Sequence, residues 1–143
     1  MNRVDRTVDL HRNNGLNCAQ ALLVAFGEPY GMNETMAGAL GRPLGGGIAK
    51  TANICGYLTA ALQILSLANE KSDESSSRKA VHAAVVELVQ RFTLLHGHLL
   101  CKDLLGADMS TPEGAKKIAD ENLIAAHCFG FGRDVAQLLD DLL

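Results

Sequence analysis

Aromatic side chains are scarce in this sequence, since they make up 4% of 143 residues and tryptophan is absent. Flat rings on which nucleic-acid bases or sugars could stack are therefore few. An excess of basic residues is missing as well, because 13 lysines and arginines face 16 aspartates and glutamates for a net charge of −3. Binding to the phosphate backbone of nucleic acids depends on such an excess. We therefore expect no nucleic-acid partner.

The sequence has no long membrane-spanning run and no secretory signal. Between Lys50 and Glu70 it carries no charge, but the apolar part extends only from Ile54 to Leu67. That length suits a buried helix better than a membrane span. Closely spaced charges from Arg3 to Arg12 leave no room for the apolar segment of a signal peptide. We expect a cytoplasmic protein without membrane insertion.

Cysteine is too sparse to serve as a structural framework. Four cysteines in 143 residues lie well below the density of small domains that fold around disulfides. In a reducing compartment, such cysteines more often serve metal binding, cluster binding or transient redox chemistry than permanent disulfides.

The remaining composition is that of an ordinary globular protein, with 48% hydrophobic and 20% charged residues. It predicts a single helical domain over residues 1–143. Almost every apolar pattern has a helical period, and no alternating stretch predicts a strand. The expected fold is all-α, a compact bundle of about five to seven helices. The expected helices cover Arg3–Arg12, a segment capped by Asn17 that runs through Phe26, a short segment capped by Asn33 with Met36 and Leu40, Ile54–Leu67, Arg78–His96 with N-caps offered by Ser75–Ser77, Pro112–Ala126 and Gly132–Leu143.

Half of the 14 glycines lie between Gly27 and Gly47, and they end in the loop Gly41–Gly47 directly before the buried helix. The loop has no Walker lysine pattern and no preceding strand, so a phosphate site is not indicated. Glycine allows the backbone to approach a neighbouring group closely. We expect a binding site at Gly45, Gly46, Gly47 and Gly56, where the backbone approaches a bound group closely.

The four cysteines, Cys18, Cys55, Cys101 and Cys128, are separated by 37, 46 and 27 residues. No closely spaced pair announces a zinc finger or a thioredoxin-type site. The first, second and fourth are expected near helix N-termini, where the helix dipole favours the thiolate, and Cys101 is the exception. Cys55 is expected to be the most reactive, because a flexible loop precedes it and Gly56 leaves space for an incoming group.

Each cysteine taken alone could equally be a small buried hydrophobe. Among the histidines, only His98 lies at helical ligand spacing from a cysteine, three residues before Cys101. His11 and His82 are expected to be surface groups or satisfied core groups. The carboxylates are scattered over polar faces and suggest no acid–base pair.

Several short elements follow one another along the chain: Cys18, Gly45-Gly46-Gly47, Cys55-Gly56 followed by Thr59-Ala60-Ala61, His96-Gly97, Cys101 with Leu104-Leu105-Gly106-Ala107-Asp108, and Cys128. This ordered set resembles the C-GCAxxG-C-C family of redox-active four-cysteine proteins. Two residues depart from the family pattern, Tyr57 for the usual alanine and Ala60 for the second glycine, so the helix packing beside Cys55 is expected to differ. The resemblance implies redox or metal function, an all-helical fold and gene neighbourhoods that often contain transporters.

Three chemistries compete if the four thiols converge: an iron–sulfur cluster, a zinc site and thiol/disulfide exchange. In both metal-binding hypotheses, the iron–sulfur cluster and the zinc site, the ligands are Cys18, Cys55, Cys101 and Cys128. Zinc is the weakest, because structural zinc ligands usually come in closely spaced pairs. The sequence leaves cluster binding and thiol/disulfide exchange open. We expect a cytoplasmic redox-active protein with a redox partner protein or a functional link to a transporter.

Two other classes of function stay open. The chain could be a helical binding or adaptor module whose cysteines are mostly structural, or a small-molecule-binding module that uses the glycine loop. A homodimer is predicted, because the apolar stripe at the C-terminus and the long helix Arg78–His96 offer more apolar surface than one small core requires. Symmetric dimers are also the commonest assembly.

Overall fold

The fold is all-α, as the helical spacing of the apolar residues predicts. The computed structural model describes residues 1–143 and contains eight α-helices and no β-strand. The count exceeds the expected five to seven because α6 is a five-residue helix, too short to show a periodic pattern. The helices are α1 (Arg3–Asn13), α2 (Cys18–Phe26), α3 (Glu34–Gly41), α4 (Gly56–Ala68), α5 (Glu74–His96), α6 (Cys101–Leu105), α7 (Pro112–Asp120) and α8 (Phe129–Leu142).

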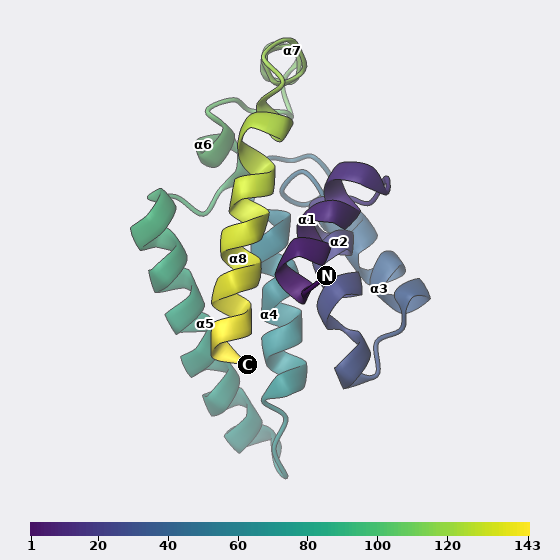
Figure 1. Ribbon diagram of the computed structural model, residues 1–143. Helices are drawn as coiled ribbons and strands as arrows, with labels where there is room; N and C mark the ends of the chain where they lie inside the picture. Colours follow the sequence, from purple (N-terminus) through teal and green to yellow (C-terminus); the bar gives the residue numbers. More distant parts are fainter.

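Helix α4 is the centre of the bundle. It packs against α2, α5 and α8, while α1 lies against α2 and α8 (Figure 1). Helices α6 and α7 gather at the end of the molecule where α8 begins. Seven of the 13 residues of α4 are buried, which agrees with the charge-free segment expected to form a buried helix.

Asparagine caps start α2 and α3, as the sequence predicts. The Asn17 side chain accepts a hydrogen bond from the Gln20 backbone N–H, and the Gln20 side chain accepts one from Asn17 N–H. Asn33 accepts from Met36 N–H at 2.9 Å. The Asn17 amide also donates to the carbonyls of Gly41 and Arg42. The cap of α2 thus holds the glycine loop in place.

The long helix α5 begins at Glu74, four residues before the expected Arg78, and ends at His96 as expected. Its N-cap is Asp73, which accepts from Ser76 N–H at 2.8 Å, so the expectation that Ser75–Ser77 cap the helix is wrong. A carboxylate at this position also interacts favourably with the helix dipole. Within its apolar stripe Leu88 and Phe92 are fully buried, but Leu95 is 58% exposed, because α5 packs on the bundle from one side.

The C-terminal third also departs from expectation. The helix predicted to reach Ala126 ends at Asp120, and Asn122 adopts a left-handed backbone with φ 51°. A π-helical turn over Ile124–Cys128 then continues into α8, which begins before the predicted Gly132. Residues 124–142 therefore form one continuous helical segment.

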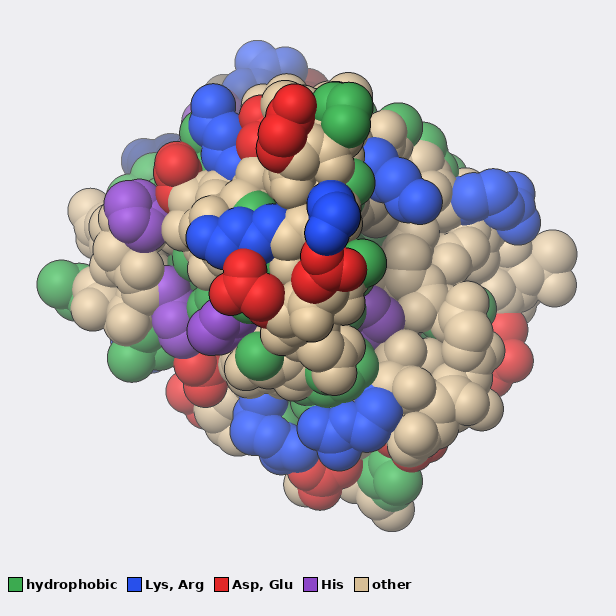
Figure 2. Space-filling view, turned by 90° about the horizontal axis from the view of Figure 1, so that it is seen from above, with side chains coloured by type: hydrophobic (Ala, Val, Ile, Leu, Met, Phe, Trp, Pro, Cys, Tyr) green, Lys and Arg blue, Asp and Glu red, His purple; other side chains and the backbone are tan.

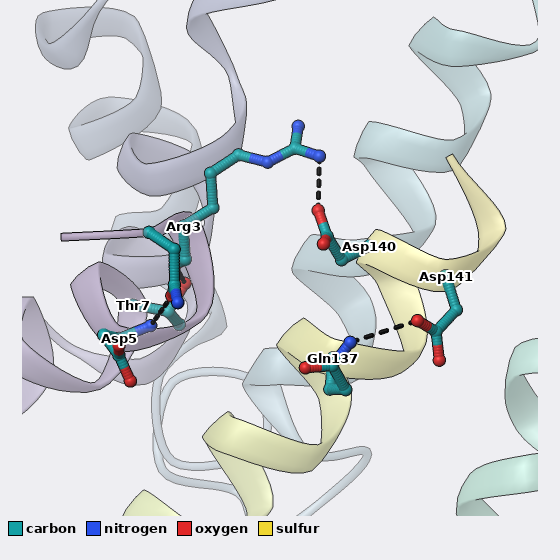
Figure 3. A network of polar contacts seen from close by, with 7 residues as sticks. Arg3, Asp5, Thr7, Gln137, Asp140 and Asp141 are labelled. Carbon is teal, nitrogen blue, oxygen red and sulfur yellow. Dashed lines mark hydrogen bonds and ion pairs between the residues drawn. The ribbon is translucent and has the colours of Figure 1, made fainter.

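The first and last helices are joined by ion pairs. Arg3 pairs with Asp140 across α1 and α8 (Figure 3), and Arg133 pairs with Asp5 at 2.7 Å. The apolar stripe of α8 is used inside the protein, since Val135 and Leu139 are fully buried. This removes one of the two reasons for expecting a homodimer, which stays a prediction. None of the helices has both the length and the apolar character needed to cross a bilayer.

Substituting Gly132 tests the contact between α8 and α4. A Cβ at Gly132 would lie 2.4 Å from Cζ of the buried Tyr57. We expect Gly132→Ala to lower the free energy of unfolding by about 1–3 kcal/mol, the usual cost of overpacking a core. Urea unfolding followed by circular dichroism measures the change.

The matched control is Gly130→Ala in the same helix, where an added Cβ meets no atom within 4 Å. Its higher helix propensity is expected to stabilise the protein by up to about 1 kcal/mol. Equal effects of the two substitutions would contradict the close packing of Gly132 on Tyr57.

Candidate functional site

The four cysteines come from four distant segments and line one cavity of about 420 Å³. Cys18 is the first residue of α2, Cys55 caps α4, Cys101 begins α6 and Cys128 ends the π-helical turn. All four are free thiols. We call this space the cysteine cavity; its other lining residues are His11, Asn17, Arg42, Gly45, Gly46, Gly47, Ala49, Lys50, Gly56, Tyr57, Leu104, Leu105, Met109, Ile124 and Phe131.

Cys18 is placed by a close approach between α2 and α4. A Cβ at Gly56 would lie 2.4 Å from the Cys18 sulfur and 2.9 Å from the Leu44 carbonyl oxygen. Gly56 was expected to leave space for an incoming group beside Cys55, but this space is occupied by the sulfur of Cys18. The glycine therefore lets the Cys18 sulfur of α2 lie against the first residue of α4, which follows Cys55 in the sequence.

Backbone N–H groups surround the Cys18 sulfur and favour its thiolate. Those of Gly46, Ala19 and Gly56 all act to lower the pKa of Cys18. Burial acts in the opposite direction and is the larger effect, so the pKa is raised overall. The helix N-terminus at Cys18 exists as predicted, but removal of the thiol from water outweighs it.

Cys55 is 7% exposed. Burial raises its pKa well above the ordinary value, and the nearby Cys18 charge adds to the rise. The N–H groups of Tyr57 and Leu58 at the start of α4 oppose it without reversing it. Burial therefore argues against the expectation that Cys55 is the most reactive of the four thiols.

Cys101 and Cys128 are both partly exposed. Burial is again the main cause that raises their pKa values, to about 11 for Cys101 and about 12 for Cys128. Cys101 was expected to be the exception among the helix starts, but it is the first residue of α6. Cys128 was expected at a helix N-terminus, but its backbone continues from the π-helical turn into α8, so no free helix end favours its thiolate.

The wall beside the thiols is a left-handed turn. Five consecutive residues from Gly46 to Lys50 have φ between 49° and 68°, and each non-glycine residue among them costs roughly 1–2 kcal/mol. Hydrogen bonds within the loop hold it, including Ala49 N–H to the Pro43 carbonyl at 2.7 Å and Asn53 N–H to the Gly47 carbonyl at 2.8 Å. The turn thus has a rigid shape.

The three glycines before and within this turn pack against the protein itself. A Cβ at Gly45 would meet the Asn17 side chain at 2.7 Å, and one at Gly46 would meet the Met109 sulfur at 2.7 Å. One at Gly47 would lie 2.5 Å from the Asn53 backbone. These glycines line the cavity and close its wall, while direct ligand binding by them stays a prediction.

His11 and Tyr57 form a polar pair at the cavity that sequence reasoning missed. The Tyr57 hydroxyl is hydrogen-bonded to Nδ1 of His11, and the imidazole packs edge-on against Phe129 with ring centroids 5.1 Å apart. Burial lowers the pKa of His11 to about 4, so the ring that is hydrogen-bonded to the tyrosine hydroxyl is neutral. The departure from the family pattern at Tyr57 was the available signal.

His98 has no place in this site. It is exposed and does not line the cysteine cavity. The neighbouring His96 instead bonds to Asp134 at 2.8 Å, away from the thiols. Helical spacing alone therefore picked the wrong histidine.

The arrangement of the thiols does not fit a metal centre. No three side chains among histidine, cysteine, aspartate and glutamate lie close enough together to hold a metal ion. Ligation by Cys18, Cys55, Cys101 and Cys128 together is not supported by this geometry.

Comparison with known proteins gives one match. The model of a family described as "Putative redox-active protein (C_GCAxxG_C_C)" matches residues 16–142. This stretch contains all four cysteines and the loop beside them, but it leaves out α1 and His11. No curated protein and no solved structure matches the chain.

Competitive alkylation of the folded protein tests the order of thiol reactivity. With iodoacetamide, we expect Cys101 to react before Cys128 and Cys55 to react last, because burial disfavours each thiolate to a different degree. The Cys101 rate should rise about tenfold per pH unit towards its pKa of about 11. Mass spectrometry of peptides gives the rates, and urea-unfolded protein, in which the differences should vanish, is the control. Modification of Cys55 as early as Cys101 would contradict the burial argument.

The neutral state of His11 makes the fold sensitive to acid. Between about pH 6.5 and its pKa of about 4, the unfolded chain binds a proton that the folded protein does not, so stability falls as the pH falls. The slope approaches about 1.4 kcal/mol per pH unit. We expect His11→Phe to reduce this slope, measured by urea unfolding at several pH values. A variant with the acid slope of the wild type would show that His11 is not buried as a neutral ring.

Proposed function

The chain belongs to the C_GCAxxG_C_C family, and on this premise we propose that it carries out reversible thiol/disulfide exchange in the cysteine cavity. The observation that carries the proposal is the convergence of four free thiols on one cavity. Transient disulfides between such thiols are the usual redox chemistry of cysteines in a reducing compartment. The cytoplasm is the compartment that we propose.

Cys18 is the shared partner of the other three thiols in this proposal. A charge on Cys18 is the largest electrostatic influence on Cys55, Cys101 and Cys128 alike. Its sulfur is also the one that backbone N–H groups surround. Those groups stabilise the negative charge that the sulfur carries when it attacks a disulfide or leaves one.

Cys101 is the thiol that we propose to meet the substrate first. It is partly exposed, and its pKa is raised less than those of Cys128 and Cys55. Its thiolate attacks a substrate disulfide, forms a mixed disulfide and releases one thiol, which takes up a proton. Cys18 then attacks the Cys101 sulfur and releases the second thiol. The protein loses two electrons and two protons, and the substrate gains them.

The alternative hypothesis, a helical binding or adaptor module, treats the cysteines as core residues. It is supported by the burial of Cys55 inside the main hydrophobic cluster, since free cysteine often packs in this way. It explains less well why three further thiols line the same cavity while remaining partly exposed.

Disulfide mapping tests the proposed pair. After mild oxidation with a small disulfide, we expect the wild-type protein to lose two titratable thiols and to yield a peptide pair that joins Cys18 to Cys101. Reduction should restore both thiols. Cys101→Ser should abolish the loss, Cys18→Ser should lose one thiol and stop at a mixed disulfide on Cys101, and Cys55→Ser should keep the loss of two thiols. An unchanged thiol count, or a disulfide that survives in both variants, would contradict the proposal.

Gly56→Ala tests the placement of the Cys18 sulfur. The added Cβ would overlap this sulfur and push it away from its partners, so disulfide formation should slow about tenfold or more, as misplaced reacting groups do. Gly38→Ala is the control, because its added Cβ meets no atom within 4 Å. Stopped-flow measurement of thiol loss gives both rates. Equal rates would show that close packing at Gly56 does not position the reacting sulfur.

A further inference from the structure

The lining of the cysteine cavity is unbalanced in charge. It includes Arg42 and Lys50 but no aspartate or glutamate, although acidic residues outnumber basic ones in the whole chain. Neither cation takes part in an ion pair. A third cation, Arg12, lies over the Phe129 ring at 4.8 Å and its charge reaches Tyr57 on the cavity wall.

Asp108 is the acidic group whose charge reaches a cavity thiol. It acts on Cys101, but its carboxylate accepts the Ser110 N–H at 2.9 Å and does not line the cavity. On the face viewed from above, basic and acidic side chains are mixed over the surface (Figure 2). The positive bias therefore belongs to the cavity and not to this face of the molecule.

The dimensions of the cavity favour a small molecule. Its volume of about 420 Å³ lies in the range of small-ligand sites. Besides Arg42 and Lys50, the apolar side chains of Leu104, Met109 and Phe131 line the cavity. The rigid left-handed turn carries Lys50 and places a cation on the wall that also holds the Gly46 N–H beside Cys18.

We infer that the substrate of the cysteine cavity is a small disulfide with negatively charged substituents, which Arg42 and Lys50 hold while one of its sulfurs meets Cys101. This inference rests on the proposed thiol/disulfide exchange and adds the substrate class. The carboxylates or sulfonates of the substrate lie at the cations, and its short apolar arms lie against the apolar wall. Reduction of the disulfide yields two anionic thiols and the Cys18–Cys101 disulfide.

A charge series of three small disulfides tests the inference. The probes are bis(2-sulfonatoethyl) disulfide with two negative charges, bis(2-hydroxyethyl) disulfide without charge, and cystamine with two positive charges. The rate of protein thiol loss is measured for each and divided by the rate with the urea-unfolded protein, which corrects for the intrinsic reactivity of each probe.

We expect this ratio to be at least about tenfold higher for the anionic disulfide than for cystamine at low salt, a modest electrostatic steering effect. The difference between the two rate ratios should shrink at about 0.5 M salt, because interactions between charges are then screened beyond a few ångströms. The double variant Arg42→Glu/Lys50→Glu should reverse the order. Lys71→Glu/Lys79→Glu changes the net charge equally, at exposed positions outside the cavity, and should keep the wild-type order.

The outcomes separate the two proposals. Oxidation by all three probes with equal corrected rates, or an anion preference that survives Arg42→Glu/Lys50→Glu, overturns the substrate class and leaves the exchange reaction standing. Failure of every probe to form a Cys18–Cys101 disulfide overturns the exchange reaction itself. Circular dichroism of each variant confirms that it is folded before its rates are compared.

Discussion

The cysteine cavity depends on the close approach of α2 and α4 at Gly56. The missing Cβ of this residue makes room for the Cys18 sulfur, and the Leu44 carbonyl and the Ala19 methyl crowd the same spot. Any side chain larger than hydrogen would separate the two helix starts or displace the sulfur. The packing of two helices thus decides where the Cys18 sulfur lies in the cavity that the other three thiols also line.

Burial and hydrogen bonding act against each other at these thiols. Cys18 and Cys55 both stand at helix starts and face backbone N–H groups, which favour a thiolate, yet desolvation dominates and raises both pKa values. A buried charge is expensive unless it is fully compensated. Burial therefore favours the protonated form of all four thiols, and it raises the pKa of the partly exposed Cys101 less than those of Cys55 and Cys128.

The backbone around Cys55 and Cys101 offsets the strain of the left-handed turn. Cys55 N–H donates to the Leu99 carbonyl at 3.0 Å, and Cys101 N–H donates to the Asn53 carbonyl at 2.6 Å. These two bonds flank the single β-bridge between Ile54 and Leu100. A few long-range hydrogen bonds thus join two cysteines 46 residues apart in the sequence and anchor the strained segment that leads into α4.

The sequence by itself determined the helical elements, because helical periodicity and asparagine caps act over a few residues. Asn17 and Asn33 cap the helices they were expected to cap, and the charge-free segment forms the buried α4. The ordered cysteine and glycine elements also sufficed to recognise the family. Only the tertiary structure decided which thiol is exposed, that Gly56 accommodates Cys18, that His11 meets Tyr57, and that Cys128 lies inside a continuous helix. These features depend on burial and on contacts between distant segments, which local spacing does not encode.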